Sequence, residues 1–222
     1  MNISYLSVLL SLSFTQFCIA QENTITPDLA KIVDEGEWNI VNREAAIVEK
    51  DDRLSVYLGA QSGDGVAWLK TIEVANGIIE VDIKGTDVRG RSFVGIAFRG
   101  VDERTYDAVY FRPFNFRSDD PVRKGHSVQY VSHPDYTWRR LREEHPEKYE
   151  NPVSPIPDPN SFFHAKIVIE TSKISVFVND GEQPSLVAET LTDRRSGWIG
   201  LWTGNNSDGT FANLRIIPTE AK

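Results

Sequence analysis

The sequence is poor in the groups that cross-link chains or bind soft metals. Its single cysteine, Cys18, lies within the first 20 residues, and residues 19–222 contain none. Disulfides, thiolate metal sites and a cysteine nucleophile are therefore excluded from that part of the chain. A cysteine-free exported domain must be stabilised by its core, which favours a bacterial envelope protein over a small disulfide-rich domain.

Positive charge is also scarce. The chain has 24 Lys and Arg against 32 Asp and Glu, which gives a net charge of −8. An acidic chain without a basic stripe repels phosphate backbones, so we expect no nucleic-acid partner. The densest basic segment holds Arg139, Arg140 and Arg142, but Glu143 and Glu144 follow at once. This mixture favours a solvated helix face.

Long apolar runs are absent after the N-terminus. Residues 1–20 carry no charged side chain and end in Cys18-Ile19-Ala20, with small residues at −3 and −1 of a cut before Gln21. We interpret residues 1–20 as a secretory signal peptide, which predicts a secreted or periplasmic protein. No later run is long enough for a transmembrane helix, so the remaining chain is not expected to span a membrane.

Several catalytic motifs are missing as well. The sequence has no Gly-x-Ser-x-Gly elbow, no His-Glu-x-x-His and no glycine-rich phosphate loop, and its four histidines lack tight ligand spacing. We therefore predict no metal site and no cofactor. One exception stays open: Asn205, Asn206 and Asp208 could bind Ca²⁺ through oxygen atoms, although a plain turn is the favoured interpretation.

The sequence is rich in the period-two alternation that is typical of β-strands. In residues 77–85, Ile79, Val81 and Ile83 share one face, polar residues share the other, and glycine stands at both ends. Similar runs cover residues 93–99, 108–112, 127–131, 164–170, 173–179, 186–189, 198–203 and 211–217. We predict an all-β, two-sheet antiparallel sandwich as a single domain over residues 36–222, after an N-terminal lead-in segment at 21–35.

Residues 132–160 interrupt the strand pattern. Asp135 can cap a short helix in which Trp138 and Leu141 share a face. The prolines that follow enforce an irregular path: Pro146, Pro152, Pro155, Pro157 and Pro159. A loop of this length in a sandwich is more often functional than a bare connector.

Polar and aromatic residues alternate on neighbouring predicted strands. Arg99 ends one strand, Tyr110 and Arg112 share a face of the next, and Gln129 lies on a third. Guanidinium and amide groups with an aromatic ring suit a sugar ligand, so we predict that these residues bind substrate. The alternative is that the tyrosines are core rings and the arginines pair with Asp102 or Asp107.

Two tryptophans extend the predicted substrate site. Trp138 in the long loop could fold over the sheet, although an anchor for the loop itself is the favoured interpretation. Trp198 and Trp202 share one strand face with Gly200 between them. We expect one of the two in the core and assign Trp202 to the pocket.

Candidate catalytic acids are harder to choose. Glycoside cleavage uses two carboxyl groups, and Asp102, Glu103 and Asp107 cluster near a strand end. A turn explains the same cluster equally well. Glu80 and Asp82 lie on the polar face of an alternating strand, where we favour a solvated surface.

Taken together, these segments resemble a known group of proteins. The matching residues are Gly77-x-Ile79-Glu80-Val81-Asp82-Ile83, Gly95-Ile96-Ala97-Phe98-Arg99, Tyr110-Phe111-Arg112-Pro113, Gln129-Tyr130, Trp138 and Gly197-x-Ile199-Gly200-Leu201-Trp202-x-Gly204. Over residues 36–218 the chain resembles the exported concanavalin A-like or laminin-G-like jelly-roll domains of bacteria and is similar to the 3-keto-disaccharide hydrolase domain family.

The resemblance implies secretion, a jelly-roll sandwich with a concave ligand face, and glycan recognition or breakdown. The positions that match are Arg99, Tyr110, Arg112, Gln129 and Trp138. The laminarinase-like signature Glu-x-Asp-x-x-Glu fails at Gly85, so that retaining mechanism is not supported.

Two classes of function follow. The favoured one is an extracytoplasmic carbohydrate-recognising domain, a monomer, for which glycoside hydrolase activity is left open. The alternative is a non-catalytic structural or protein-interaction module of the cell envelope. Fold likeness alone does not decide between them.

Overall fold

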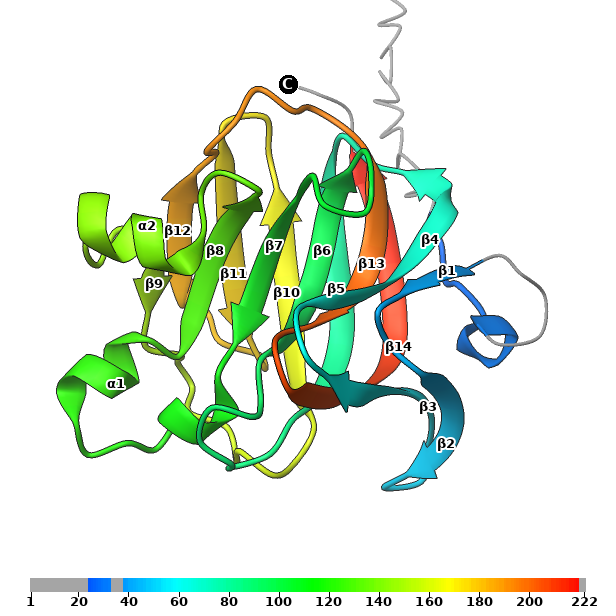
Figure 1. The fold of residues 1–222 in the computed structure, drawn as a ribbon, viewed down its shortest axis with the longest axis horizontal. Helices are drawn as coiled ribbons and strands as arrows, with labels where there is room; N and C mark the ends of the chain where they lie inside the picture. Colours follow the sequence, from blue (N-terminus) through cyan, green and yellow to red (C-terminus); the bar gives the residue numbers. More distant parts are fainter. Residues whose placement is uncertain (1–23, 33–37, 220–222) are drawn as a thin grey trace, which may run out of the picture.

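The computed structural model describes residues 24–32 and 38–219 (Figure 1). The predicted signal peptide at residues 1–20 lies outside these residues, as do the first part of the lead-in segment and residues 33–37. In the described lead-in, Leu29–Ile32 form a short 3₁₀ helix, η1, and the Asp28 carboxylate accepts a hydrogen bond from the Ala30 backbone N–H.

Two antiparallel sheets of seven strands each face one another (Figure 1). The first, called the front sheet here, has the order β1-β4-β13-β6-β7-β8-β9. Its strands are β1 (Trp38–Val41), β4 (Gly65–Glu73), β13 (Trp198–Thr203), β6 (Val94–Gly100), β7 (Tyr106–Phe111), β8 (Val128–His133) and β9 (Glu150–Asn151).

The second, the back sheet, has the order β12-β11-β10-β5-β14-β3-β2. Its strands are β12 (Leu186–Glu189), β11 (Lys173–Val178), β10 (Phe163–Ile169), β5 (Asn76–Lys84), β14 (Ser207–Thr219), β3 (Arg53–Gln61) and β2 (Ala45–Lys50). The predicted two-sheet antiparallel sandwich is confirmed.

The core lies between the sheets and follows the alternation in the sequence. On β5, Ile79, Val81 and Ile83 are fully buried, while Glu80 and Asp82 lie on the outer face of the back sheet. Glu80 pairs with Arg215 and Asp82 with Arg53 on that surface. The inward row is buried because each strand presents every second side chain to the opposite sheet.

One strand breaks the alternation. Arg99, near the end of β6, has a positive φ of 51°, and the pairing of β6 with β13 shifts register there. Such a bulge redirects the side chain that it carries. Arg99 therefore points between the sheets and not toward the outer face of the front sheet.

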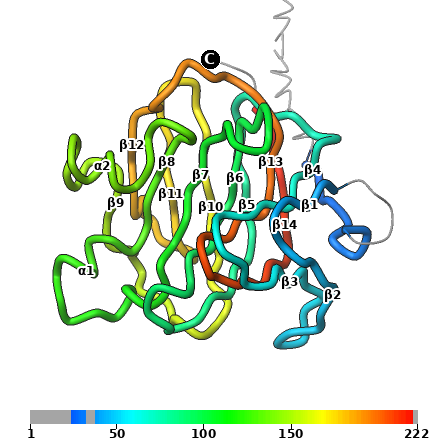
Figure 2. The backbone as a smooth tube through the Cα atoms, in the orientation of Figure 1, coloured from blue at the N-terminus to red at the C-terminus, as the bar shows by residue number. Residues whose placement is uncertain are grey.

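The connections between β7 and β9 carry the remaining helices. A 3₁₀ turn, η2 (Pro113–Asn115), follows β7, and α1 (Pro121–Gly125) is capped by Asp120. The helix predicted in the long loop is α2 (Trp138–Glu144), capped by Thr137 rather than Asp135. Both α-helices lie beside the β8–β9 edge of the front sheet (Figure 2).

The helices are all short. The longest in the described part of the chain, α2, has seven residues. None of the described helices combines the length and the apolar character that crossing a membrane requires.

Candidate functional site

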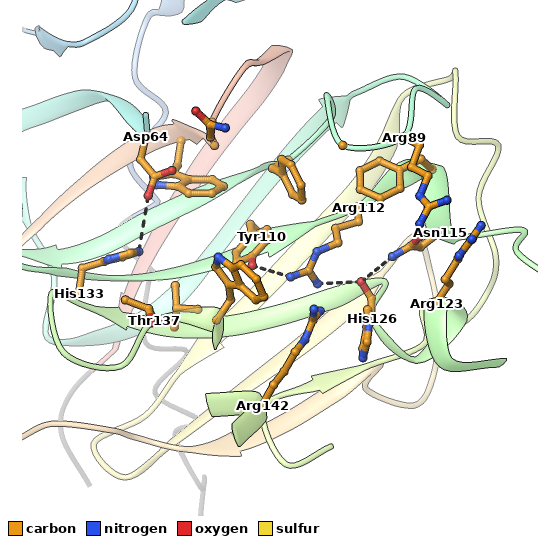
Figure 3. A pocket seen from close by; sticks show the side chains of 18 residues that line it. Asp64, Arg89, Tyr110, Arg112, Asn115, Arg123, His126, His133, Thr137 and Arg142 are labelled. Carbon is orange, nitrogen blue, oxygen red and sulfur yellow. Dashed lines mark hydrogen bonds and ion pairs between the residues drawn. The ribbon is translucent and has the colours of Figure 1, made fainter. Parts of the chain in front are cut away.

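A cavity of about 570 Å³ opens on the outer face of the front sheet (Figure 3). Strands β7, β8 and β13 form its floor, and its walls come from the β3–β4 and β5–β6 loops and from α1 and α2. Its volume lies within the roughly 300–1,000 Å³ of small-ligand sites. The lining residues are Asp64, Arg89, Gly90, Phe93, Tyr110, Arg112, Phe114, Asn115, Arg123, His126, Val131, His133, Thr137, Trp138, Arg142, Trp202, Gly204 and Asn205.

Aromatic rings form much of the floor. The rings of Tyr110 and Trp202 lie 4.9 Å apart at an angle of 40°, and Phe93 packs edge-on against both Tyr110 and Phe114. Trp202 Nε1 donates a hydrogen bond to the Tyr106 hydroxyl over 3.2 Å, which fixes the orientation of its ring. Tyr110 and Trp202 are each only 3% exposed, whereas Phe93 and Phe114 are half-buried, so the apolar surface against which a sugar ring can stack comes largely from the two phenylalanines.

A buried polar cluster lies beside this floor. Arg112 Nη2 donates to the Tyr110 hydroxyl over 2.6 Å and also to Gln129 Oε1, and Nη1 donates to the His126 carbonyl over 2.8 Å. The Tyr110 hydroxyl in turn donates to Gln129 Oε1 over 2.9 Å. Burial raises the pKa of Tyr110 and lowers the pKa of Arg112. The network holds the guanidinium plane in one orientation at the cavity wall.

Glu150 anchors the long loop to this cluster. Short strand β9 pairs Glu150 with Gln129 of β8. Both oxygens of its buried carboxylate accept from Arg142, at 2.9 Å to Nε and 2.7 Å to Nη2. His126 Nε2 lies 3.2 Å from Oε1, and Arg112 Nη1 lies 3.8 Å from Oε2. Burial lowers the pKa of His126, although Glu150 opposes this shift.

Asp64 and His133 lie at the opposite end of the cavity (Figure 3). Asp64 precedes β4, His133 ends β8, and 3.7 Å separates Asp64 Oδ2 from His133 Nε2. Burial raises the pKa of the Asp64 carboxyl and lowers the pKa of the His133 ring. Both groups are thus shifted toward their neutral forms, as in sites that hold or pass a proton.

Four of the predicted substrate-binding residues line the cavity: Tyr110, Arg112, Trp138 and Trp202. Gln129 is buried and reaches the cavity wall through its bonds to Tyr110 and Arg112. Trp138 opens α2 and remains 44% exposed. The structure thus brings together residues from β7, β8, β13 and the long loop.

Arg99 and the predicted acid Asp107 lie elsewhere, fully buried between the sheets. Asp107 accepts from Tyr130, Ser132 and Arg194 over 3.0, 2.6 and 2.6 Å. Arg99 Nη1 lies 3.6 Å from Asp107, and Arg99 Nη2 donates to the Glu170 carbonyl. This is the internal pairing left open as the alternative, and a ligand in the cavity cannot touch either residue.

The other two predicted acids belong to the β6–β7 turn. Asp102 Oδ1 accepts from the backbone N–H groups of Arg104 and Thr105, each over 2.8 Å, and these bonds lower the pKa of Asp102. Glu103 is exposed in the same turn. Neither residue lines the cavity, so the turn accounts for their clustering.

Several cavity residues escaped the sequence reasoning. Asp64 and Arg89 come from loops whose meeting depends on which strands are neighbours, and no local pattern shows this. Arg123 lies on a five-residue helix that was not predicted. Arg142 belongs to the basic segment that was interpreted as a solvated helix face, but its side chain is only 28% exposed and it lines the cavity.

The turn considered for calcium holds two loops together. Asn205 Oδ1 accepts from the Gly63 backbone N–H over 2.8 Å, and Asp208 Oδ2 accepts from the Tyr57 hydroxyl over 3.1 Å. Within residues 24–32 and 38–219, no three His, Cys, Asp or Glu side chains lie together as metal ligands would. Calcium dependence stays a prediction that chelation can check.

No protein-family model matches this sequence, and no curated protein sequence matches it. Likeness to the 3-keto-disaccharide hydrolase family therefore stays a prediction.

Solved structures do match the fold. The carbohydrate binding module CBM66 from Bacillus subtilis is 16% identical with a TM-score of 0.56, covering 81% of this chain and 94% of its own. A Bacillus subtilis protein of unknown function with a galectin-like fold is 12% identical with a TM-score of 0.57, covering 88% and 94%.

A glycoside hydrolase family 16 endo-glucanase from Bacteroides ovatus is 10% identical with a TM-score of 0.55, covering 83% of this chain and 96% of its own. At these identities the likeness extends to the fold, and the jelly-roll sandwich is confirmed.

Proposed function

We propose that this protein is an extracytoplasmic carbohydrate-binding domain whose ligand lies in the cavity on the outer face of the front sheet. The observation that carries the proposal is the junction of Tyr110 and Trp202 with Arg112. There, an aromatic floor and a fixed set of hydrogen-bond donors meet in one open cavity. Extracytoplasmic location rests on the signal peptide predicted at residues 1–20.

Sugar rings need both kinds of surface. Their C–H faces stack on aromatic rings, and their hydroxyls require donors and acceptors that are already positioned. Arg112 is held by Tyr110, Gln129 and the His126 carbonyl, so it loses little side-chain freedom on binding. Two of the compared solved structures are named as a carbohydrate binding module and an endo-glucanase, which supports a glycan ligand here.

Glycoside cleavage is the second candidate function. The position and the raised pKa of Asp64 favour it. Asp64 lies in the cavity 3.7 Å from His133, and partial burial raises its pKa although His133 and Arg43 oppose the shift, which is the direction that favours a proton donor. Glycoside hydrolysis generally uses two carboxyl groups, however. Among the described residues, Asp64 is the one acidic residue that lines the cavity, and Glu150 is engaged by Arg142 and His126. We therefore rank binding ahead of catalysis.

A glycan-array screen of the purified protein, followed by calorimetry on each hit, tests the proposal. Trp138→Ala should weaken binding about tenfold, because one aromatic contact at an open site contributes about 1–1.5 kcal/mol. Leu54→Ala is the matched control, since Leu54 is an exposed apolar side chain on β3 of the back sheet. Equal losses in both variants would contradict the site assignment.

Two further outcomes decide between the classes of function. If hits are converted to products and Asp64→Asn abolishes conversion while leaving affinity within about threefold, the protein is an enzyme. If no glycan binds at all, the structural or protein-interaction module becomes the better account.

A further inference from the structure

Arginines gather at one end of the cavity. Arg89, Arg112, Arg123 and Arg142 all line it, and they come from four different segments: the β5–β6 loop, the end of β7, α1 and α2. Figure 3 shows them on one side, beside Asn115 and His126, whereas Asp64 and His133 occupy the other side. The cavity is therefore polarised along its length.

The carboxylates beside these arginines balance only part of their charge. Arg112 and Arg142 share Glu150, and Arg123 Nε lies 3.4 Å from Asp120 Oδ2 across a pair that is nearly half exposed. Arg89 has no ion pair or hydrogen bond within the described part of the chain. The whole chain has a net charge of −8, so the excess of positive charge at this end of the cavity is confined to these arginines.

Building on the proposed function, we infer that the cavity is selective for acidic oligosaccharides, with the sugar's carboxylate or sulfate group at the arginine end. Arg89, and Arg123 through the part of its guanidinium that does not face Asp120, supply the donors for that group. Arg112 and Arg142, held in place by Glu150, add to the positive potential of the wall. The arginines that line the cavity are absent from the Asp64 end, so the difference between the two ends orients the ligand.

Arginine suits this role because its planar fork matches carboxylate and sulfate oxygens in a bidentate geometry. The neighbouring aromatic floor makes a bare inorganic anion a poor match, since the exposed parts of Phe93 and Phe114 would stay uncovered. A ring that carries an anionic substituent fills both halves of the cavity.

Calorimetry with matched ligand pairs tests the inference. Oligogalacturonate is compared with its methyl-esterified form, and a sulfated galactan oligosaccharide with its desulfated form, which distinguishes a carboxylate from a sulfate. We expect the acidic member of at least one pair to bind at least tenfold more tightly, and this preference to shrink as salt rises.

Arg89→Gln and Arg123→Gln should each reduce that preference about five- to tenfold and lower the affinity for the neutral form by a smaller factor, because both side chains are exposed and support no buried group. Arg117→Gln is the matched control. Arg117 is an exposed arginine of the same region that pairs with Asp158 and does not line the cavity. It should change neither affinity.

The possible failures are distinguishable. Neutral and acidic ligands of equal affinity, or a preference that survives both arginine substitutions, would overturn the inference while the binding function stands. A preference that Trp138→Ala leaves intact and that phosphate buffer abolishes would mean adsorption of any anion, and would also overturn it. Absence of binding to every glycan would defeat the proposed function itself.

Discussion

Strands β7 and β8 carry two polar networks of similar composition on opposite faces. Inside the sandwich, Asp107, Tyr130 and Ser132 meet Arg99 and Arg194. On the outer face, a cluster with the same kinds of group opens onto the cavity. Its members are Tyr110, Arg112, Gln129, Glu150, Arg142 and His126.

The two networks differ in what surrounds them. The inner one lies between the two sheets, where all its members except the partly exposed Arg194 are buried, so we expect its groups to act on stability. The outer one adjoins a cavity that a ligand can enter. Its strand residues alternate along β7 and β8 with those of the inner network, and therefore point to the opposite face. Chemical composition is therefore a poor guide to function here, and the face of the strand decides.

The largest loss of stability is expected from a substitution in the inner network. Asp107→Ala leaves the buried Arg99 without its carboxylate, so the free energy of unfolding should fall by about 3–5 kcal/mol. Urea denaturation measures the change, with Glu103→Ala as the control, which should stay within about 0.5 kcal/mol. A loss below about 1 kcal/mol would show that the inner network is not a stability element.

Removing the outer arginine should cost both stability and affinity. Arg112→Met removes one donor each from the Tyr110 hydroxyl, Gln129 Oε1 and the His126 carbonyl, all of them buried or partly buried, so the free energy of unfolding should fall by about 1–3 kcal/mol. Glycan affinity should fall with it, and Arg112→Lys should restore neither fully, because lysine lacks the planar fork. Denaturation and calorimetry on the same samples measure the two effects, and full rescue by lysine would contradict this account.

Two tyrosine substitutions should change the free energy of unfolding less and still distinguish the two networks. Tyr110→Phe and Tyr130→Phe each remove one buried hydroxyl and should each lower the free energy of unfolding by about 1 kcal/mol. Glycan affinity should fall in Tyr110→Phe and stay unchanged in Tyr130→Phe. Equal affinities in the two variants would erase the distinction between the networks.

The smallest effect is expected at a partly exposed pair on the back sheet. His164 Nδ1 lies 2.9 Å from Asp82 Oδ1, and their hydrogen bond raises the pKa of His164 above 6.5 and, together with Asn213, lowers the pKa of Asp82 below 3.8. The pair should contribute fully between these values. Its contribution is lost as pH rises through the raised pKa of His164, or falls through the lowered pKa of Asp82.

This contribution should be about 0.5 kcal/mol, since exposed pairs are screened. Denaturation at pH 5.5 and pH 8.5 should reveal a difference in wild type that His164→Gln removes. An unchanged difference in His164→Gln would assign the pH dependence to other groups.

Much of this architecture is predictable from alternation alone. Period-two patterning predicts the inward-facing row on β5, which is Ile79, Val81 and Ile83. Together with strand pairing, it also accounts for Tyr110 and Trp202 lying on the same face as the cavity. Arg99 was misplaced because a bulge reverses its direction, and a bulge leaves no clear mark in composition.

The remaining site residues are set by topology. Asp107 was a candidate catalytic acid because it follows Asp102 and Glu103 closely in the sequence, whereas its partner Arg194 is 87 positions away. Asp64, Arg89 and Arg123 reach the cavity from three separate connections. Their meeting follows from strand order, which periodicity does not encode.

A structure of the protein with its tightest glycan tests the central claim most directly. The sugar should lie over Tyr110 and Trp202 with Arg112 within hydrogen-bond distance, and without contact to Arg99 or Asp107. A glycan bound on the back sheet, or at the β6–β7 turn that carries Asp102 and Glu103, would contradict the assignment of this cavity as the binding site.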